Sequence, residues 1–341
     1  MSEKKYTNIG GQAVIEGVMM RSPHYMTIAV RKPNGTILLK EQEWKGIAHR
    51  LPIFKKPFLR GVLTLFESMW NGIEALSYSA SIASQFDEEN TTGKPISNWA
   101  LAGSMLTAFA FGIAIFVAAP HLITVLLSKL GFYDANASSP LFHLVDGVIK
   151  VFFLVTYIYA ISFMDDIRRV FQYHGAEHKS IYAFEANLDL TVENASKFTT
   201  QHPRCGTSFL LLLLVTSIVV FSVVFPILGI NASGSIVKHL GIVLVKIVLM
   251  LPVASISYEL IRLSAKYVSN PICKALIFPG LSLQNLTTKE PDPQQLEVAL
   301  AALKRVLLLE KHPELLNQTE SEIESVSQIQ SVAATAAEFP G

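Results

Sequence analysis

Four long runs of apolar residues dominate the pattern of the chain. They are residues 99–119, 141–164, 207–228 and 236–258. A helix of roughly 20 apolar residues is long enough to cross a lipid bilayer. The pattern therefore predicts four transmembrane helices. Because the stretch before the first run is polar, we expect no signal peptide.

Before the first run, the pattern is that of a small folded region. Residues 26–30 and 36–39 flank a Pro-Asn-Gly turn at 33–35, and this arrangement predicts a β-hairpin. The preceding residues 10–21 resemble one short strand bounded by glycines. From 57 to 84, apolar side chains recur at every third or fourth position, which predicts an amphipathic helix. That helix lies either on the membrane surface, which the basic residues at its start favour, or in the core of a cytoplasmic domain.

After the last run, the pattern predicts one more helix and then a tail. The helix covers 293–310, because Pro293 follows Asp292, a favourable N-cap, and leucines recur along one face. From Asn317 onward Ser, Gln, Glu and Ala dominate, so the tail is expected to be disordered.

The predicted fold is a mostly α-helical, polytopic membrane protein with a small α+β cytoplasmic part. We expect an N-terminal α+β region, a four-helix membrane region that includes a cytoplasmic loop, a C-terminal helical region and the disordered tail. Their boundaries are 1–98, 99–262 with the loop at 165–206, 263–312 and 313–341.

The basic residues predict the orientation of these helices. The first 98 residues hold twelve Lys and Arg, and more occur in 165–206 and after 262. The loops 130–140 and 229–235 hold none. Because loops rich in Lys and Arg stay in the cytoplasm, both termini and the middle loop are expected there.

The composition agrees with a membrane protein and excludes other classes. Of the 341 residues, 50% are hydrophobic and 16% are charged, whereas about 25% charged residues is usual in soluble proteins. The net charge of +1 gives no general basic field, so we expect no nucleic-acid partner. Two cysteines, Cys205 and Cys273, are too few for a disulfide framework.

The middle loop contains the pattern that most clearly suggests chemistry. His174, Glu177 and His178 form His-x-x-Glu-His, which places all three side chains on one face of a helix. Two imidazoles four residues apart can share one metal ion, and the carboxylate can bind the metal or accept a proton from bound water. The same spacing occurs in inverted zincins. The alternative is a helix whose histidines meet lipid headgroups or cap a helix end.

Further candidate ligands lie near the ends of the third and fourth runs. His202 and Cys205 are three residues apart just before the third run, and both are good zinc or iron ligands. Glu259 follows the fourth run and could complete the coordination, or it could pair with Arg262. Cys205 could equally be a small buried residue at a helix start.

A few charges lie inside the predicted membrane helices. Asp146 and Lys150 are four residues apart in the second run, and Lys246 lies well inside the fourth. Because an unpaired charge is costly in a membrane, Asp146 is expected to pair with one of the two lysines. Such a pair could be a structural clamp or part of a polar path.

Several of these stretches resemble the YqhQ-like family of bacterial integral membrane proteins. They are residues 10–17, 166–179, 202–207, 257–262 and 279–297, and the resemblance extends over most of 8–310. It implies a multi-pass protein of the bacterial cell (inner) membrane that has been thought to be a metal-dependent enzyme. It supplies no substrate.

Three hypotheses follow. In the first, the protein is a membrane-embedded metal-dependent hydrolase that holds zinc or a similar divalent ion, with His174, His178 and one of His202, Cys205 and Glu259 as ligands, and with Glu177 as general base. In the second, it is a carrier or assembly factor, and four helices would require a homo-oligomer. In the third, the metal is a structural staple. Membrane lipids are the expected surroundings in each case.

Overall fold

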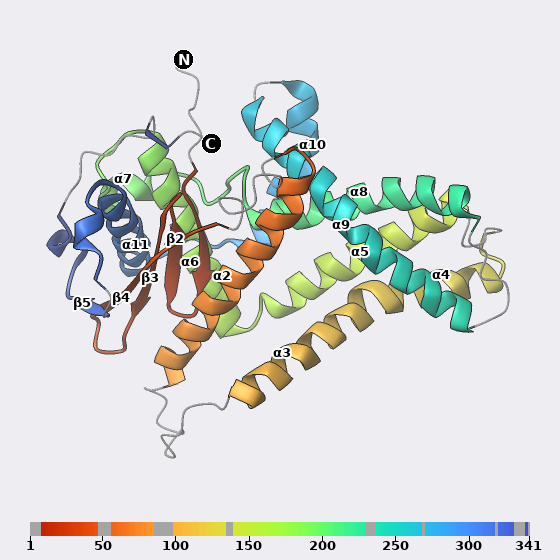
Figure 1. Cartoon of the computed structure of the whole chain (residues 1–341), viewed down its shortest axis with the longest axis horizontal. Coiled ribbons are helices and arrows are strands. Elements are labelled where there is room, and N and C mark those ends of the chain that lie inside the picture. The colour runs from red at the N-terminus through yellow and green to blue at the C-terminus, as the bar shows by residue number, and fades with distance from the viewer. Residues whose placement is uncertain are drawn as a thin grey trace.

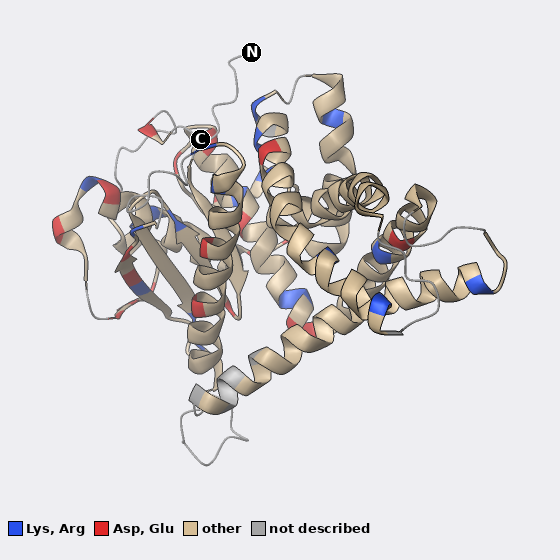
Figure 2. Cartoon of the chain, turned by 45° about the vertical axis from the view of Figure 1, so that its right-hand side comes forward, with Lys and Arg blue, Asp and Glu red and all other residues tan. Residues whose placement is uncertain are grey.

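The computed structural model describes residues 8–46, 56–84, 98–133, 139–229, 236–267, 270–317, 320–330 and 338–339. These residues form two parts that lie side by side (Figure 1). One part, the sheet region, contains the β-sheet and the helices packed on it. The other, the helical bundle, contains the long apolar helices. Figure 2 shows that charged residues gather on the sheet region and are sparse along the bundle.

The sheet has five antiparallel strands in sequence order. They are β1 (Gly10–Val14), β2 (Gly17–Arg21), β3 (Tyr25–Arg31), β4 (Ile37–Glu43) and β5 (Ser321–Ile323). The predicted hairpin is confirmed as β3 and β4. Residues 10–21, predicted as one strand, instead form the hairpin β1–β2, because Glu16 adopts a positive φ of 52° and reverses the chain.

Helices cover both faces of the sheet, as the alternation of side chains along a strand requires. Val18 and Met20 face α6 (Asp165–Glu185) and α11 (Pro293–Lys311). Met19 lies on the opposite face, with Ala75 and Ile82 of α2 (Leu59–Ser84). The short helix α7 (Val192–Ser196) also packs on α6 and α11. The predicted C-terminal helix is confirmed as α11, which begins with a capping box at Asp292.

The expectation of a disordered tail is wrong for its described residues. Strand β5 pairs with β4, and Ile329 and Phe339 are buried in the core between the sheet and α11. Single-turn 3-10 helices, η3 (Pro313–Leu315) and η4 (Val326–Gln328), lie on either side of β5. Polar composition misled the prediction, because a few apolar residues are enough to hold a segment against an existing sheet edge.

The helical bundle confirms the four predicted spans. The first combines α3 (Asn98–Ile113), a π-helical turn (Ala114–Ala118) and α4 (Ala119–Lys129), and the others are α5 (Pro140–Ile161), α8 (Gly206–Leu228) and α9 (Ile236–Lys266). The helices long and apolar enough to cross a membrane are Leu106–Lys129, Pro140–Ile161, Gly206–Leu228 and Val237–Ser264. The first therefore lies later in the chain than the predicted 99–119. It runs through Pro120, directly after the π-helical turn.

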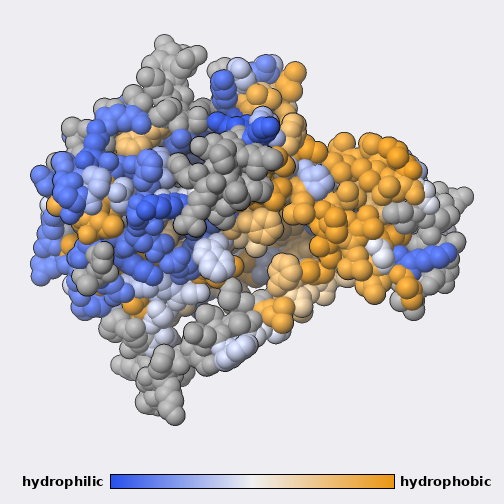
Figure 3. Space-filling model, in the orientation of Figure 1, coloured by the Kyte–Doolittle hydropathy of each residue, from blue (hydrophilic) through white to orange (hydrophobic). Residues whose placement is uncertain are grey.

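Apolar side chains cover most of the face of this bundle that is visible in Figure 3. Phe152, Val219 and Val248 are each at least 60% exposed. A continuous apolar surface of this kind needs an apolar solvent, so the bundle indicates a membrane protein.

Two helices connect the bundle to the sheet region. The first, α2, packs on the sheet through its C-terminal half and on α9 through its N-terminal part, where Gly61 meets the backbone of Ser255. The second, α10 (Pro271–Thr287), lies along α8 and was not predicted. Gly280 permits this close packing, because a side chain there would lie 2.8 Å from the Cα of Ser208.

Candidate metal centre

The two histidines of the middle loop lie on α6, where helix α10 and the strands surround them. The helix starts with Asp165 and Asp166, whose carboxylates favour a helix N-terminus. Gly175 lets α6 approach the chain after α10, because a Cβ at this position would lie 2.1 Å from the carbonyl oxygen of Lys289. The glycine between the two histidines therefore allows α6 to pack closely against the chain after α10.

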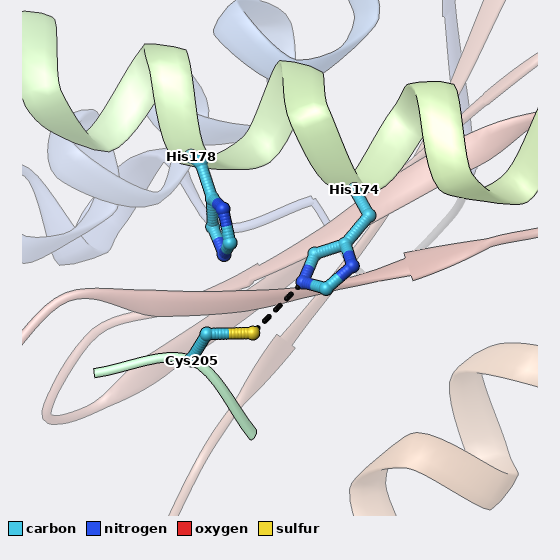
Figure 4. Close-up of side chains that lie close together, drawn as sticks. All are labelled: His174, His178 and Cys205. Carbon is cyan, nitrogen blue, oxygen red and sulfur yellow. Dashed lines mark hydrogen bonds between the residues drawn. The ribbon is translucent and has the colours of Figure 1, made fainter. Parts of the chain in front are cut away.

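His174, His178 and Cys205 converge from two elements (Figure 4). One ligand atom of each lies within 4.8 Å of those of the other two. His174 Nε2 is 3.0 Å from Cys205 Sγ. Cys205 is the N-cap of α8, and its sulfur accepts a hydrogen bond from the N–H of Thr207 at 3.4 Å. These three are the candidate ligands that the fold brings together.

Backbone carbonyl groups orient both imidazoles. Nδ1 of His174 lies 2.9 Å from the carbonyl oxygen of Thr287, at the end of α10. Nδ1 of His178 is hydrogen-bonded to the carbonyl oxygen of Thr200. A carbonyl only accepts, so each Nδ1 carries a proton, and Nε2 is the ring nitrogen that each histidine leaves for the site. This arrangement of a bonded Nδ1 and an available Nε2 is typical of histidines that bind a metal.

Glu177 is buried beside the two histidines and is held by the first strand. Its Oε1 accepts a hydrogen bond from the backbone N–H of Gly11 at 3.1 Å. A side chain at Gly11 would lie 2.9 Å from Cγ of Glu177 and 2.6 Å from the carbonyl oxygen of Met19. One of the N-terminal glycines, Gly11, thus allows the backbone to reach Glu177.

The charges of the site are strongly coupled. Burial alone would favour the neutral forms, but the neighbouring sulfur raises the pKa of His174 to about 9. Burial also opposes ionisation of Cys205, yet His174 and His178 hold the pKa of its thiol well below the usual value. Burial raises the pKa of Glu177. The two imidazoles therefore favour the thiolate form of Cys205, the form of cysteine that binds metals.

His202 lies next to this group but faces another partner. Its ring packs against those of His178 and Tyr182, with centroids 5.4 Å and 4.7 Å away. Its Nε2 is 3.6 Å from Glu185 Oε2, and Gln284 binds its backbone N–H and carbonyl group. Among the described residues, the group of ligand atoms within 4.8 Å does not include His202.

Glu259 is not brought to the site at all. It forms a two-armed ion pair with Arg60 of α2 and accepts a hydrogen bond from the N–H of Phe58. The alternative partner considered for it, Arg262 on the same helix, is thus replaced by a residue about 200 positions away. The sequence could not show this, because the pairing depends on how α2 packs across α9.

The charges predicted inside the membrane helices do meet. Asp146 Oδ2 accepts from Lys150 Nζ at 2.8 Å and from Lys246 Nζ at 2.7 Å. The expected pair is therefore a group of three. It lies in the bundle, apart from the candidate metal centre.

Comparison with known proteins identifies the family of the chain but no activity. Residues 56–309 match a family model described as a protein of unknown function (DUF1385). The chain is similar to the uncharacterized protein YqhQ of Bacillus subtilis (strain 168), with 34% identity over 310 residues, which cover 88% of this chain and 92% of that protein. No solved structure matches the chain.

Proposed function

This chain belongs to the DUF1385 family of proteins of unknown function, and we propose that it is a membrane protein with a buried zinc centre. His174, His178 and Cys205 are the proposed ligands. The observation that carries the proposal is the pair of carbonyl groups, from Thr287 and Thr200, that leave both Nε2 atoms available to the site beside one sulfur. Two imidazoles and a thiolate suit zinc better than the hard cations that prefer oxygen ligands.

Hydrolysis is the activity that this donor set supports best. Three protein ligands leave a fourth position on zinc, where the metal can polarise a carbonyl or phosphoryl group and acidify water. Glu177 is the proposed general base. It lies in the same helical arc as the ligands, and Gly11 fixes one of its oxygens. The proposed substrate is a peptide bond or a lipid-linked ester close to the membrane.

The metal itself can be tested first. We expect the full-length protein, purified in mild detergent without chelator, to contain about one zinc per chain. His178→Ala and Cys205→Ala should lose it. His312→Ala is the control, because His312 is an exposed histidine outside the site. Wild-type protein without stoichiometric metal would overturn the proposal.

The catalytic role is tested separately with Glu177→Gln. The variant should keep its zinc and lose hydrolysis of a panel of peptides and lipid esters. If zinc is present and the variant behaves like the wild type in every assay, the centre is a structural staple or part of a carrier. In that case removal of zinc should lower thermal stability, because the ligands join α6 to the start of α8.

A second candidate function uses the same atoms without a metal. Cys205 sits at a helix N-terminus with His174 Nε2 at 3.0 Å, an arrangement that also activates cysteine nucleophiles. Alkylation followed by peptide mapping separates the two. A zinc ligand should react only after chelation, whereas Cys273, half-buried, serves as a control that reacts in both conditions. Rapid alkylation of Cys205 in untreated, metal-free protein would favour the nucleophile.

A further inference from the structure

The helical bundle contains a second cluster of ionisable residues that the proposed zinc centre does not use. Asp146, Lys150, Lys246 and His121 are all at most 5% exposed, and they come from α4, α5 and α9. Ionisable residues at such positions are costly, and they commonly mark routes for ions or protons.

Hydrogen bonds link these residues into one chain that reaches the surface. His239 Nδ1 lies 3.1 Å from His121 Nε2, and His121 Nδ1 lies 3.3 Å from Lys246 Nζ. Lys246 then donates to Asp146, to which Lys150 also donates. His239 is half-buried, near the start of α9, so the chain leads from a partly accessible imidazole to a fully buried carboxylate.

The charges in this cluster do not balance. Two lysines share one carboxylate oxygen. The fourth helix around the cluster, α8, offers the Phe221 ring to both ammonium groups but has no ionisable side chain between 206 and 228. Among the residues that the structure describes, the remaining titratable neighbours are His143 on α5, Lys129 at the end of α4, whose charge acts on His239, and Tyr133, which donates to the carbonyl of Thr124. With both lysines protonated, the cluster carries one uncompensated positive charge in apolar surroundings, which is unfavourable.

We propose that the Asp146–Lys150–Lys246 cluster is a proton-exchange site inside the membrane, and that His121 and His239 connect it to one side. The excess proton is the mobile one. It leaves a lysine ammonium, passes through the two imidazoles and is taken up by water at His239. The acceptor atoms for its return are the lysine nitrogen and Asp146 Oδ1, which is buried and makes no hydrogen bond within the described residues.

The hydrogen bonds end at His239, near the start of α9. The start of α9 lies at the end of the bundle away from the sheet (Figure 1). In the other direction, the hydrogen bonds of Lys150 end at Asp146 among the residues that the structure describes. The cluster is thus a one-sided proton store, which responds to pH on the face opposite the sheet region, rather than a continuous path across the bundle.

The test uses the full-length protein in liposomes, labelled with 15N at the lysine side chains. Solid-state NMR distinguishes amine from ammonium as pH is raised from about 6 to about 10. We expect one lysine signal to behave as a neutral amine in a range where the others remain ammonium. Each of the single variants Lys246→Met and Lys150→Met should abolish that signal, because either change leaves one lysine for one carboxylate. Lys238→Met, an exposed neighbour of His239, should keep it.

The His239→Gln variant tests the connection to one side. His239 is half-buried, so the fold tolerates a change there more readily than a change in the core. The amine signal should persist, but exchange between its two forms should slow at least about tenfold, because a positioned proton carrier is lost. Ammonium signals for every lysine across the whole pH range would overturn the proposal. So would an unchanged exchange rate in His239→Gln, or an amine signal that survives Lys150→Met.

Discussion

The backbone N–H of Gly11 donates to the carboxylate of Glu177 across 166 residues of sequence, at 3.1 Å. This contact joins the first strand to the helix that carries the candidate zinc ligands. It also explains why a side chain is excluded at Gly11, where a Cβ would lie 2.6 Å from one backbone oxygen and 2.9 Å from Glu177.

Gly11→Ala should therefore damage both the fold and the site. We expect the free energy of unfolding to fall by about 1–3 kcal/mol, because the added methyl group forces the strand away from α6. Thermal unfolding in detergent measures this. Gly10→Ala is the matched control, since a Cβ at Gly10 meets nothing within 4 Å. Equal stability of the two variants would contradict the contact.

Glu259→Gln should leave the zinc content unchanged. Glu259 is bound to Arg60 and Phe58, so removing its charge loosens α2 from α9 without touching the candidate ligands. The partly exposed ion pair contributes about 1 kcal/mol or less. Metal analysis, with His178→Ala measured for comparison, checks the zinc content. Thermal unfolding checks the contribution of the ion pair to stability. Loss of zinc from Glu259→Gln would restore Glu259 as a ligand.

Gly280→Ala should separate α10 from α8. A Cβ at Gly280 would lie 2.7 Å from the Cβ and 2.8 Å from the Cα of Ser208, and a backbone atom cannot yield as a flexible side chain can. We expect a loss of stability of about 1–3 kcal/mol. Because α10 also supplies the Thr287 carbonyl that orients His174, zinc should bind more weakly. Gly206→Ala on α8, where the space is open, should change neither measurement.

Acid should release the C-terminal segment. Burial alone would raise the pKa of Glu297, but the N–H of Val326 and the guanidinium of Arg31 hold it below its ordinary value of 4.5. This contribution to stability is complete above pH 4.5 and is lost as pH falls through the lower pKa of the folded protein. Hydrogen exchange of residues 320–330, corrected for the intrinsic rate at each pH, should show the loss of protection.

Glu297→Gln should produce the same loss of protection already at neutral pH. Glu324→Gln, which changes an exposed carboxylate in the same segment, is the control. If protection of 320–330 were unaffected by Glu297→Gln, the segment would be held by strand pairing and apolar contacts alone.

The four spans and the spacing of His174 and His178 were predictable from the sequence alone. Both depend on local periodicity: a run of apolar residues matches the thickness of a bilayer, and positions four apart share a helix face. The sequence also predicted the hairpin β3–β4 and helix α11, because a Pro-Asn-Gly turn and an Asp-Pro start act within a few residues.

The tertiary structure decided which distant groups meet. It selected Cys205 over His202 and Glu259 as the neighbour of the two histidines, and it supplied carbonyl groups from Thr287 and Thr200 that carry no sequence signal, since every residue has one. It also joined Asp146 to two lysines instead of one. These outcomes depend on how whole helices and strands pack, and packing is a property of the complete chain rather than of any short pattern within it.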